Sequence, residues 1–300
     1  FQDFEQALAE FEAAAESLPN DAESHQAIGY IHRRLGDLDS AIENLELAAE
    51  LDPQDANILI NLGSTYRARR EFDKALELAD RSLALRPQND GYYFVKANYI
   101  MDGTGDLVEA RKVLDQAPGT DMIGGAFNWI DYHFRTRDFD GLIARMESID
   151  SPVPFVQGAR QLVIAFAIGL RDGPEAARAD LEAARALIEP MLEAAPGNAQ
   201  LHGWMAGILA FLGEEEAAIR ASELSVELTE KDKFSGLQAV EGLAQTYATV
   251  GRPDEAFELR ERLFESDYEG SITVPDLELD PAWDLLRDDP RYQALIEKHS

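Results

Sequence analysis

The amino-acid sequence predicts an all-α protein, a solenoid of stacked helix hairpins. One observation behind this prediction is a pattern that runs twice at a spacing of 34 residues. Its matched pairs are Ile28 with Leu62, Gly29 with Gly63, Ala41 with Ala75 and Pro53 with Pro87. The other is the helical spacing of the apolar residues between these landmarks. A fixed period of about 34 residues that reads helix, turn, helix is typical of hairpins stacked into one array.

Composition limits the classes of function. The chain has 300 residues, 45% of them hydrophobic, which is typical of a packed protein. Its formal net charge of −30 repels nucleic-acid phosphates, so we expect no nucleic-acid binding. The longest apolar run, residues 162–168, is far shorter than the roughly 20 residues of a membrane span, so we expect no membrane insertion by this segment. The absence of cysteine excludes disulfides and thiolate metal sites.

The first predicted element is an amphipathic helix at residues 1–18, in which Phe4, Leu8 and Phe11 recur at helical spacing. It matches the second helix of a hairpin rather than the first. The matched landmarks are Ala7, Phe11, Ala14 and Pro19. Because the first helix of that hairpin is missing and the chain does not begin with Met, we expect it to be part of a longer protein.

Two complete hairpins follow. The first is predicted at about 22–35 and 38–51, with Asn20 and Asp21 available to cap its first helix and Gly36 to end it. A proline closes each hairpin because proline cannot extend a helix. The second hairpin copies this plan. Its landmarks are Leu62, Gly63, Tyr66, Ala75 and Pro87.

At these positions the sequence resembles the tetratricopeptide repeat (TPR) family. The first copy supplies His25, Ile28, Gly29, His32, Ala41, Leu45, Ala48 and Pro53, and the second supplies Leu59, Leu62, Gly63, Tyr66, Ala75, Ala79, Ser82 and Pro87. The resemblance implies a right-handed α-solenoid of TPR hairpins over about residues 1–265. That array has a half repeat at 1–20 and about seven hairpins after it, with degenerate repeats at 120–195.

The later repeats keep fewer landmarks. Residues 152–195 are predicted to form a longer hairpin, at about 154–171 and 174–194, with Asp172-Gly173-Pro174 between its helices. The landmarks kept in the other repeats are Phe94, Ala97, Ala110, Leu114, Trp129, Leu142, Met146, His202, Met205, Ala206, Gly213, Ala218, Leu243, Ala244, Tyr247, Gly251 and Ala256.

Residues 266–300 leave the pattern and are predicted to form a C-terminal cap of short helices, because an open array exposes its last helix. Each of two Asp-Pro steps, at Asp280 and Asp289, places a capping Asp before a proline suited to the first helical position. The stretch 279–292 also resembles the tail of TPR regions in bacterial signalling proteins. There the TPR region follows a protein kinase, a nucleotide cyclase or a winged-helix regulator domain, so the resemblance implies a module of a larger signalling protein.

The sequence does not favour an enzyme, and we expect no cofactor and no metal. It contains no Gly-rich phosphate loop, and carboxylate pairs are too numerous for one pair to be selected as acid and base. His25 and His32 lie seven residues apart on one helix face, but both occupy TPR packing positions. We therefore favour core roles for them over a metal pair.

A binding groove follows from the TPR resemblance, which implies that the first helix of each hairpin lines a concave surface. The exposed positions there are Gln26, Tyr30, Arg33, Asn57, Ile60, Ser64, Arg67, Tyr92, Val95 and Tyr99. Arginine and tyrosine are favourable interface residues, so one hypothesis is a groove for a protein or peptide segment that carries acidic residues. The alternative is that the arginines complement the ends of their own helices or pair with neighbouring carboxylates.

Further hypotheses concern the partner and the compartment. We do not expect the carboxylate clamp of chaperone-binding TPRs. Among the residues at the corresponding positions, only Lys96 is basic. Self-association through an aromatic-rich region is a second hypothesis, with core packing as its alternative. That region comprises Tyr92, Tyr93, Phe94, Tyr99, Phe127, Trp129, Tyr132 and Phe134. The expected location is cytoplasmic, or periplasmic if a membrane span precedes residue 1.

Overall fold

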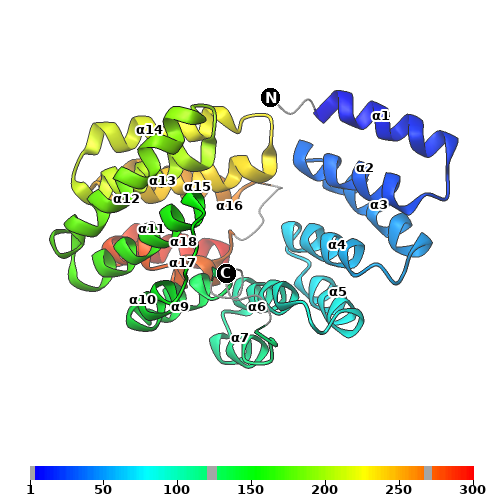
Figure 1. Ribbon diagram of the computed structural model, residues 1–300, viewed down its shortest axis with the longest axis horizontal. Helices are drawn as coiled ribbons and strands as arrows, with labels where there is room; N and C mark the ends of the chain where they lie inside the picture. The colour runs from blue at the N-terminus through cyan, green and yellow to red at the C-terminus, as the bar shows by residue number, and fades with distance from the viewer. Residues whose placement is uncertain (1–3, 120–126, 267–271) are drawn as a thin grey trace. The chain divides into compact units, whose positions relative to one another are not determined.

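The computed structural model describes residues 4–119, 127–266 and 272–300, and these residues are arranged in helices with no strand among them (Figure 1). The predicted all-α fold of stacked helix hairpins is therefore confirmed. The described residues form two compact units. The first unit holds 4–119 with the short segments 231–235, 266 and 272–273, and the second holds 127–230, 236–265 and 274–300.

The first unit contains a leading helix and three hairpins (Figure 1). Its helices are α1 (Phe4–Ser17), α2 (Ala22–Leu35), α3 (Leu38–Leu51), α4 (Ala56–Ala68), α5 (Phe72–Leu85), α6 (Asp90–Thr104) and α7 (Leu107–Leu114). The two helices of each hairpin pack along each other, and successive hairpins pack through α3 with α4 and through α5 with α6. The predicted bounds 22–35 and 38–51 match the observed helices.

Local signals fix the ends of these helices. The Asp21 carboxylate accepts a hydrogen bond from the Ser24 backbone N–H at 3.1 Å and so caps α2. Gly36 ends α2 with a φ of 89°, a left-handed conformation that favours glycine. Asp55 and Asn89 cap α4 and α6 in the same way. These three caps recur at the 34-residue spacing, so each turn restarts the pattern at the same point.

Close approach within the first hairpin requires a residue without a side chain at Gly29. A Cβ atom there would lie 2.7 Å from Leu45 Cγ and 2.9 Å from the Ala41 carbonyl oxygen, both on the facing helix α3. Leu45 and Ala41 are themselves fully buried. At the matching Gly63 the nearest atom, the Ala75 carbonyl oxygen, would be 3.3 Å from such a Cβ. The first hairpin is thus packed more tightly than the second.

The second unit continues with hairpins and ends in short helices. Its elements are α9 (Ile130–Thr136), α10 (Phe139–Glu147), α11 (Pro154–Asp172), α12 (Pro174–Ala194), α13 (Ala199–Leu212), α14 (Glu215–Leu228), α15 (Lys233–Thr249, from residue 236 on), α16 (Pro253–Phe264), α17 (Val274–Leu279), the 3₁₀ helix η1 (Pro281–Leu286) and α18 (Pro290–His299). The longer hairpin predicted at 154–171 and 174–194 is confirmed by α11 and α12.

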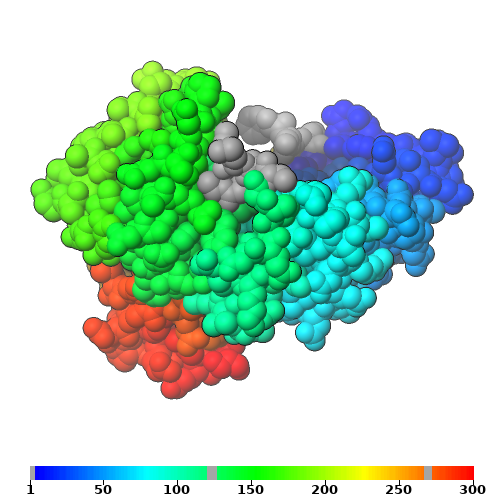
Figure 2. All heavy atoms as spheres, turned by 60° about the horizontal axis from the view of Figure 1, so that its bottom comes forward, coloured from blue at the N-terminus to red at the C-terminus, as the bar shows by residue number. Residues whose placement is uncertain are grey.

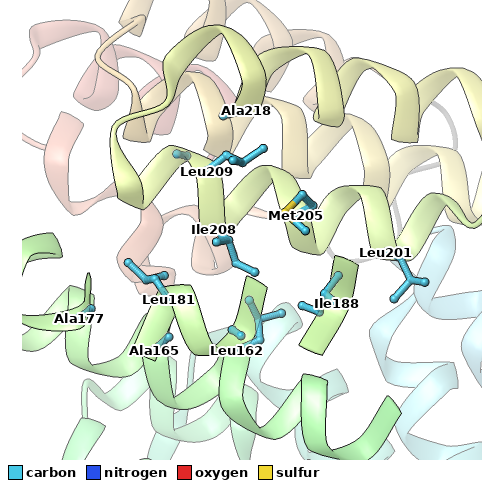
Figure 3. Close-up of a cluster of buried hydrophobic side chains, with 12 residues drawn as sticks. Leu162, Ala165, Ala177, Leu181, Ile188, Leu201, Met205, Ile208, Leu209 and Ala218 are labelled. Atoms are coloured by element: carbon cyan, nitrogen blue, oxygen red, sulfur yellow. The ribbon is translucent and has the colours of Figure 1, made fainter. Parts of the chain in front are cut away.

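The core of the second unit lies where α11, α12, α13 and α14 meet. Figure 3 shows Leu162, Leu181, Ile188 and Ile208 directed toward one another from three of these helices. Leu162 and Ile208 are buried, in keeping with the strongly apolar sequences of α11 and α13, and Leu181 and Ile188 of α12 are fully buried. None of the helices in the described parts of the chain combines the length and the apolar character needed to cross a membrane.

Buried ion pairs tie the C-terminal helices to the rest of the second unit. Arg260 on α16 is fully buried, and its guanidinium donates to Glu241 on α15 and to Asp276 on α17, each at 2.6 Å. Arg135 on α9 donates to the same Asp276 at 3.1 Å. Figure 2 shows the orange-to-red C-terminal helices lying against the green helices of this unit. Because an unpaired buried charge is costly, these partners depend on one another.

The two Asp-Pro steps act as predicted. Asp280 accepts from the Ala282 backbone N–H and Asp289 from the Arg291 backbone N–H, both at 2.9 Å, so each carboxylate caps the short helix that follows. Asp280 also accepts from Gln245 Nε2 on α15 at 2.9 Å. The capping residue therefore has a second role in joining the C-terminal segment to the hairpins.

Two carboxyl groups near Arg260 have raised pKa values. Burial, together with the charge of Asp276, raises the pKa of Glu241 to about 7. The same two causes raise the pKa of Asp280 to about 6. With Asp276, three carboxyl groups thus lie near two guanidinium groups, those of Arg260 and Arg135. Uptake of one proton by a carboxyl group would make the net charge of these five groups zero.

The substitution Gly29→Ala tests the close approach of α2 and α3. We expect it to lower the free energy of unfolding by about 1 to 3 kcal/mol, because the added methyl group overlaps Leu45 and the Ala41 carbonyl. Gly242→Ala on α15 is the matched control: its Cβ would meet nothing within 4 Å, so it should stabilise by about 0.5 to 1 kcal/mol. Urea denaturation followed by circular dichroism measures both, and a Gly29→Ala variant as stable as wild type would contradict the packing.

The substitution Glu241→Gln tests the proton linkage at Arg260. A carboxyl whose pKa rises on folding, here from 4.5 to about 7, stabilises the fold below the unfolded pKa, and this contribution is lost as the pH rises through about 7. We expect wild-type stability to fall by about 1 to 3 kcal/mol more than that of Glu241→Gln between about pH 5 and pH 8.

Glutamine keeps an acceptor for Arg260, so the fold should survive this substitution. Glu297→Gln on the exposed face of α18 is the control, and it should retain the wild-type pH dependence. Parallel stability curves for wild type and Glu241→Gln, from thermal unfolding at each pH, would refute the linkage.

Candidate functional site

Polar side chains join α4 to α6 across the face predicted to line the groove. The Tyr92 hydroxyl donates to Asn57 Oδ1 at 2.8 Å, and the Ser64 and Tyr99 hydroxyl oxygens lie 2.8 Å apart. Further along, Arg67 Nε donates to a carboxylate oxygen of Asp102 at 2.7 Å. Each pair is 35 residues apart in sequence, so the repeat brings the same faces of successive first helices together. Five of the ten predicted groove residues take part in these contacts.

Exposure of all ten residues was expected, and this is wrong for Arg33, Tyr92 and Tyr99. Arg33 is only 5% exposed because its guanidinium donates to the Asn61 carbonyl at 3.1 Å and lies 3.4 Å from Thr65 Oγ1, joining α2 to α4. Tyr92 and Tyr99 are 7% and 2% exposed, and the Tyr99 ring belongs to the core cluster with Leu59 and Leu62 of α4. Burial raises the pKa of both phenols, which therefore stay protonated.

The other seven residues reach solvent to different extents. Tyr30 and Asn57 are exposed, and Tyr30 accepts a hydrogen bond from Arg34 Nη2 at 2.6 Å. The half-buried members are Gln26, Ile60, Ser64, Arg67 and Val95. Ile60 lies between Asn57 and Ser64 on α4, and Val95 occupies the matching place on α6, so these two apolar side chains flank the polar contacts.

The arginines mostly pair within the protein. Arg67 lies against the fully buried Asp102, and Arg69 Nη1 is 2.6 Å from Asp39. With Arg33 bound to backbone and hydroxyl oxygens, these contacts favour the alternative in which groove arginines serve internal pairing.

A cleft that sequence reasoning missed opens beside two of the predicted residues. Its volume is about 430 Å³, and Asn57 and Tyr92 form one side. The rest of the lining is Leu85 at the end of α5 and the turn to α6, which supplies Arg86, Pro87, Gln88 and Asn89. Arg86 was not selected because it lies in the turn and not on a first helix. The signal that identifies it is the 34-residue spacing, which places Asp52 at the same point of the preceding turn.

The electrostatics of the cleft depend on Arg86. Burial has the largest effect on the pKa of Tyr92 and raises it. The Arg86 guanidinium lowers this pKa, and the charge of Asp55 raises it. Arg86 is exposed, and within the described parts of the chain its side chain forms no ion pair or hydrogen bond. The Tyr92 hydroxyl donates to Asn57 Oδ1, so the Asn57 amide nitrogen remains as a donor at the cleft beside the Arg86 guanidinium.

Other candidate chemistry is accounted for by packing. His25 Nε2 lies 3.1 Å from the Pro19 carbonyl oxygen, and His32 Nδ1 lies 3.4 Å from Asp37. The described residues contain no group of three side chains able to hold a metal ion. Of the eight aromatic residues weighed for self-association, Tyr92 and Tyr99 are buried and the other six are half-buried.

Comparison with known proteins identifies the repeats. A model described as "TPR repeat" matches residues 29–68, and one described as "Tetratricopeptide repeat" matches residues 58–91. No curated protein matches the chain.

Among solved structures, a chain of the APC/C hetero-tetramer Cut9–Hcn1 is 12% identical with a TM-score of 0.46, over 99% of this chain and 46% of that one. This chain thus spans about half the length of that relative. YrrB, described as a TPR protein with an unusual peptide-binding site, is 14% identical with a TM-score of 0.32, over 76% of this chain and 96% of that one. The family matches and the helix–turn–helix hairpins at a 34-residue spacing agree, so residues 29–91 of this chain are tetratricopeptide repeats.

Proposed function

We propose that this TPR protein is a protein-interaction scaffold whose first unit binds a segment of a partner along α2, α4 and α6. The observation that carries the proposal is the surface left by the contacts between α4 and α6. Polar pairs fix the two helices, Ile60 and Val95 remain half-buried on them, and Asn57 and Tyr92 line a cleft of about 430 Å³. A rigid surface with apolar positions and unsatisfied donors is suited to an extended or helical segment.

The wider role that we propose is a module of a larger bacterial signalling protein. The resemblance of residues 279–292 to the tails of such proteins supports this role. In the same proposal, residues 1–265 form the TPR array and residues 266–300 form its C-terminal cap. The ion pairs of Arg260 and Arg135 with Asp276 support the capping role, since they hold α17 on hairpins of the array.

Site-specific photo-crosslinking tests the proposed surface. A benzophenone amino acid replaces Ile60 or Val95 in one set of variants and the exposed Glu77 on α5 in the control. We expect discrete products with a partner at Ile60 and Val95, identified by mass spectrometry, and none at Glu77, because only the first helices line the groove. Equal labelling at Glu77 would contradict the assignment, and products formed only between two copies of this chain would support self-association instead.

A further inference from the structure

We propose that the cleft formed by Asn57, Arg86 and Tyr92 binds a carboxylate, namely the side chain of an Asp or Glu residue in a bound peptide. The inference rests on the proposed function, because it assigns a ligand chemistry to one end of the proposed surface. It follows from the donors in the cleft, from its walls and from the way its turn differs from the preceding one.

The cleft presents donors from Arg86 and from the Asn57 amide. Arg86 carries five N–H donors in a planar fork that matches the two oxygens of a carboxylate. The Asn57 amide is oriented by the hydroxyl of Tyr92, which donates to Oδ1 at 2.8 Å and leaves the amide nitrogen to donate. Asp55 is the nearby carboxylate, but one of its oxygens accepts from the Asn57 backbone N–H at 2.7 Å in capping α4.

The walls of the cleft suit a short aliphatic stem. Leu85 and Pro87 belong to the lining, on either side of Arg86 in the turn. An Asp or Glu side chain can place its methylene groups against these apolar atoms while its carboxylate reaches the guanidinium. An inorganic anion would leave this apolar surface unused, so the lining favours a carboxylate on an organic chain.

Comparison with the preceding turn shows that the site is particular to this position. Residues 51–55 read Leu-Asp-Pro-Gln-Asp, and residues 85–89 read Leu-Arg-Pro-Gln-Asn. The leucine, proline and glutamine that shape the turn are kept, whereas the two carboxylates are replaced by Arg86 and Asn89. Asn57 likewise stands where the first repeat has Glu23. The same scaffold is thus acidic in one copy and able to accept an anion in the next.

Nuclear magnetic resonance titration of the full chain tests the site. The probe is the capped tetrapeptide acetyl-Leu-Glu-Glu-Leu-amide, and its control is acetyl-Leu-Gln-Gln-Leu-amide, at about 0.15 M salt so that charges beyond about 8 Å are screened. We expect saturable shifts of the Asn57 amide and Arg86 Nε–H signals with the Glu peptide only. Arg86→Asp should weaken binding roughly tenfold or more, the usual effect of losing a hydrogen bond to a charged group.

Arg81→Asp is the matched control, because Arg81 is an exposed arginine on α5 outside the cleft lining, and it should bind like wild type. Equal shifts with the Gln peptide, unchanged binding by Arg86→Asp, or no shift at the cleft at millimolar peptide would each overturn the proposal. Crosslinking at Ile60 does not depend on a carboxylate. If the cleft does not bind the Glu peptide while Ile60 still crosslinks to a partner, the ligand chemistry is refuted and the proposed scaffold function is not.

Discussion

The close approach of two helices within each hairpin is the constraint on which the rest of this structure depends. Small residues at the contact allow that approach, and they are fully buried in both units. They include Ala41, Ala48, Ala75, Ala79, Ala177, Ala184 and Ala218. Where small residues face each other, the ridges of one helix enter the grooves of the next at a shorter interaxial distance. Where a Cβ would already collide, as at Gly29, the sequence has no side chain at all.

The regular hairpins in turn set the register between successive repeats. Because each repeat advances by 34 residues, facing positions on neighbouring first helices are 35 residues apart, as in the contacts of Tyr92 with Asn57 and of Tyr99 with Ser64. These contacts use polar groups that would otherwise be available to a partner. The proposed binding surface therefore relies on the apolar pair Ile60 and Val95 and on the donors of the cleft.

The sequence was sufficient to predict the helices but not the surroundings of their polar residues. Periodicity located α2, α3, α11 and α12 because burial on one face is a property of each helix alone. The burial of Arg33 depends on Asn61 and Thr65 of the next repeat, which helical spacing cannot reveal. Arg260 is a stronger case. Its acceptors come from α15 and from the C-terminal segment, and a fully buried arginine has no signature in the spacing of its own helix.

The distribution of charge explains why one turn can differ so much from its neighbour. With a net charge of −30, the protein repels anions at long range, yet this field is screened beyond about 8 Å at physiological salt. Within that distance the local side chains determine whether an anion is attracted. Most arginines near the predicted groove are paired with oxygen atoms of the protein. Arg86 has no such match among the described residues, whereas Asp52 occupies its place one repeat earlier. In the proposed cleft, a ligand that is only acidic gains the contacts to Arg86 and Asn57 but still meets the general repulsion. A segment that combines an acidic residue with apolar neighbours would also gain from Leu85, Pro87, Ile60 and Val95, so the proposed surface would select for that combination.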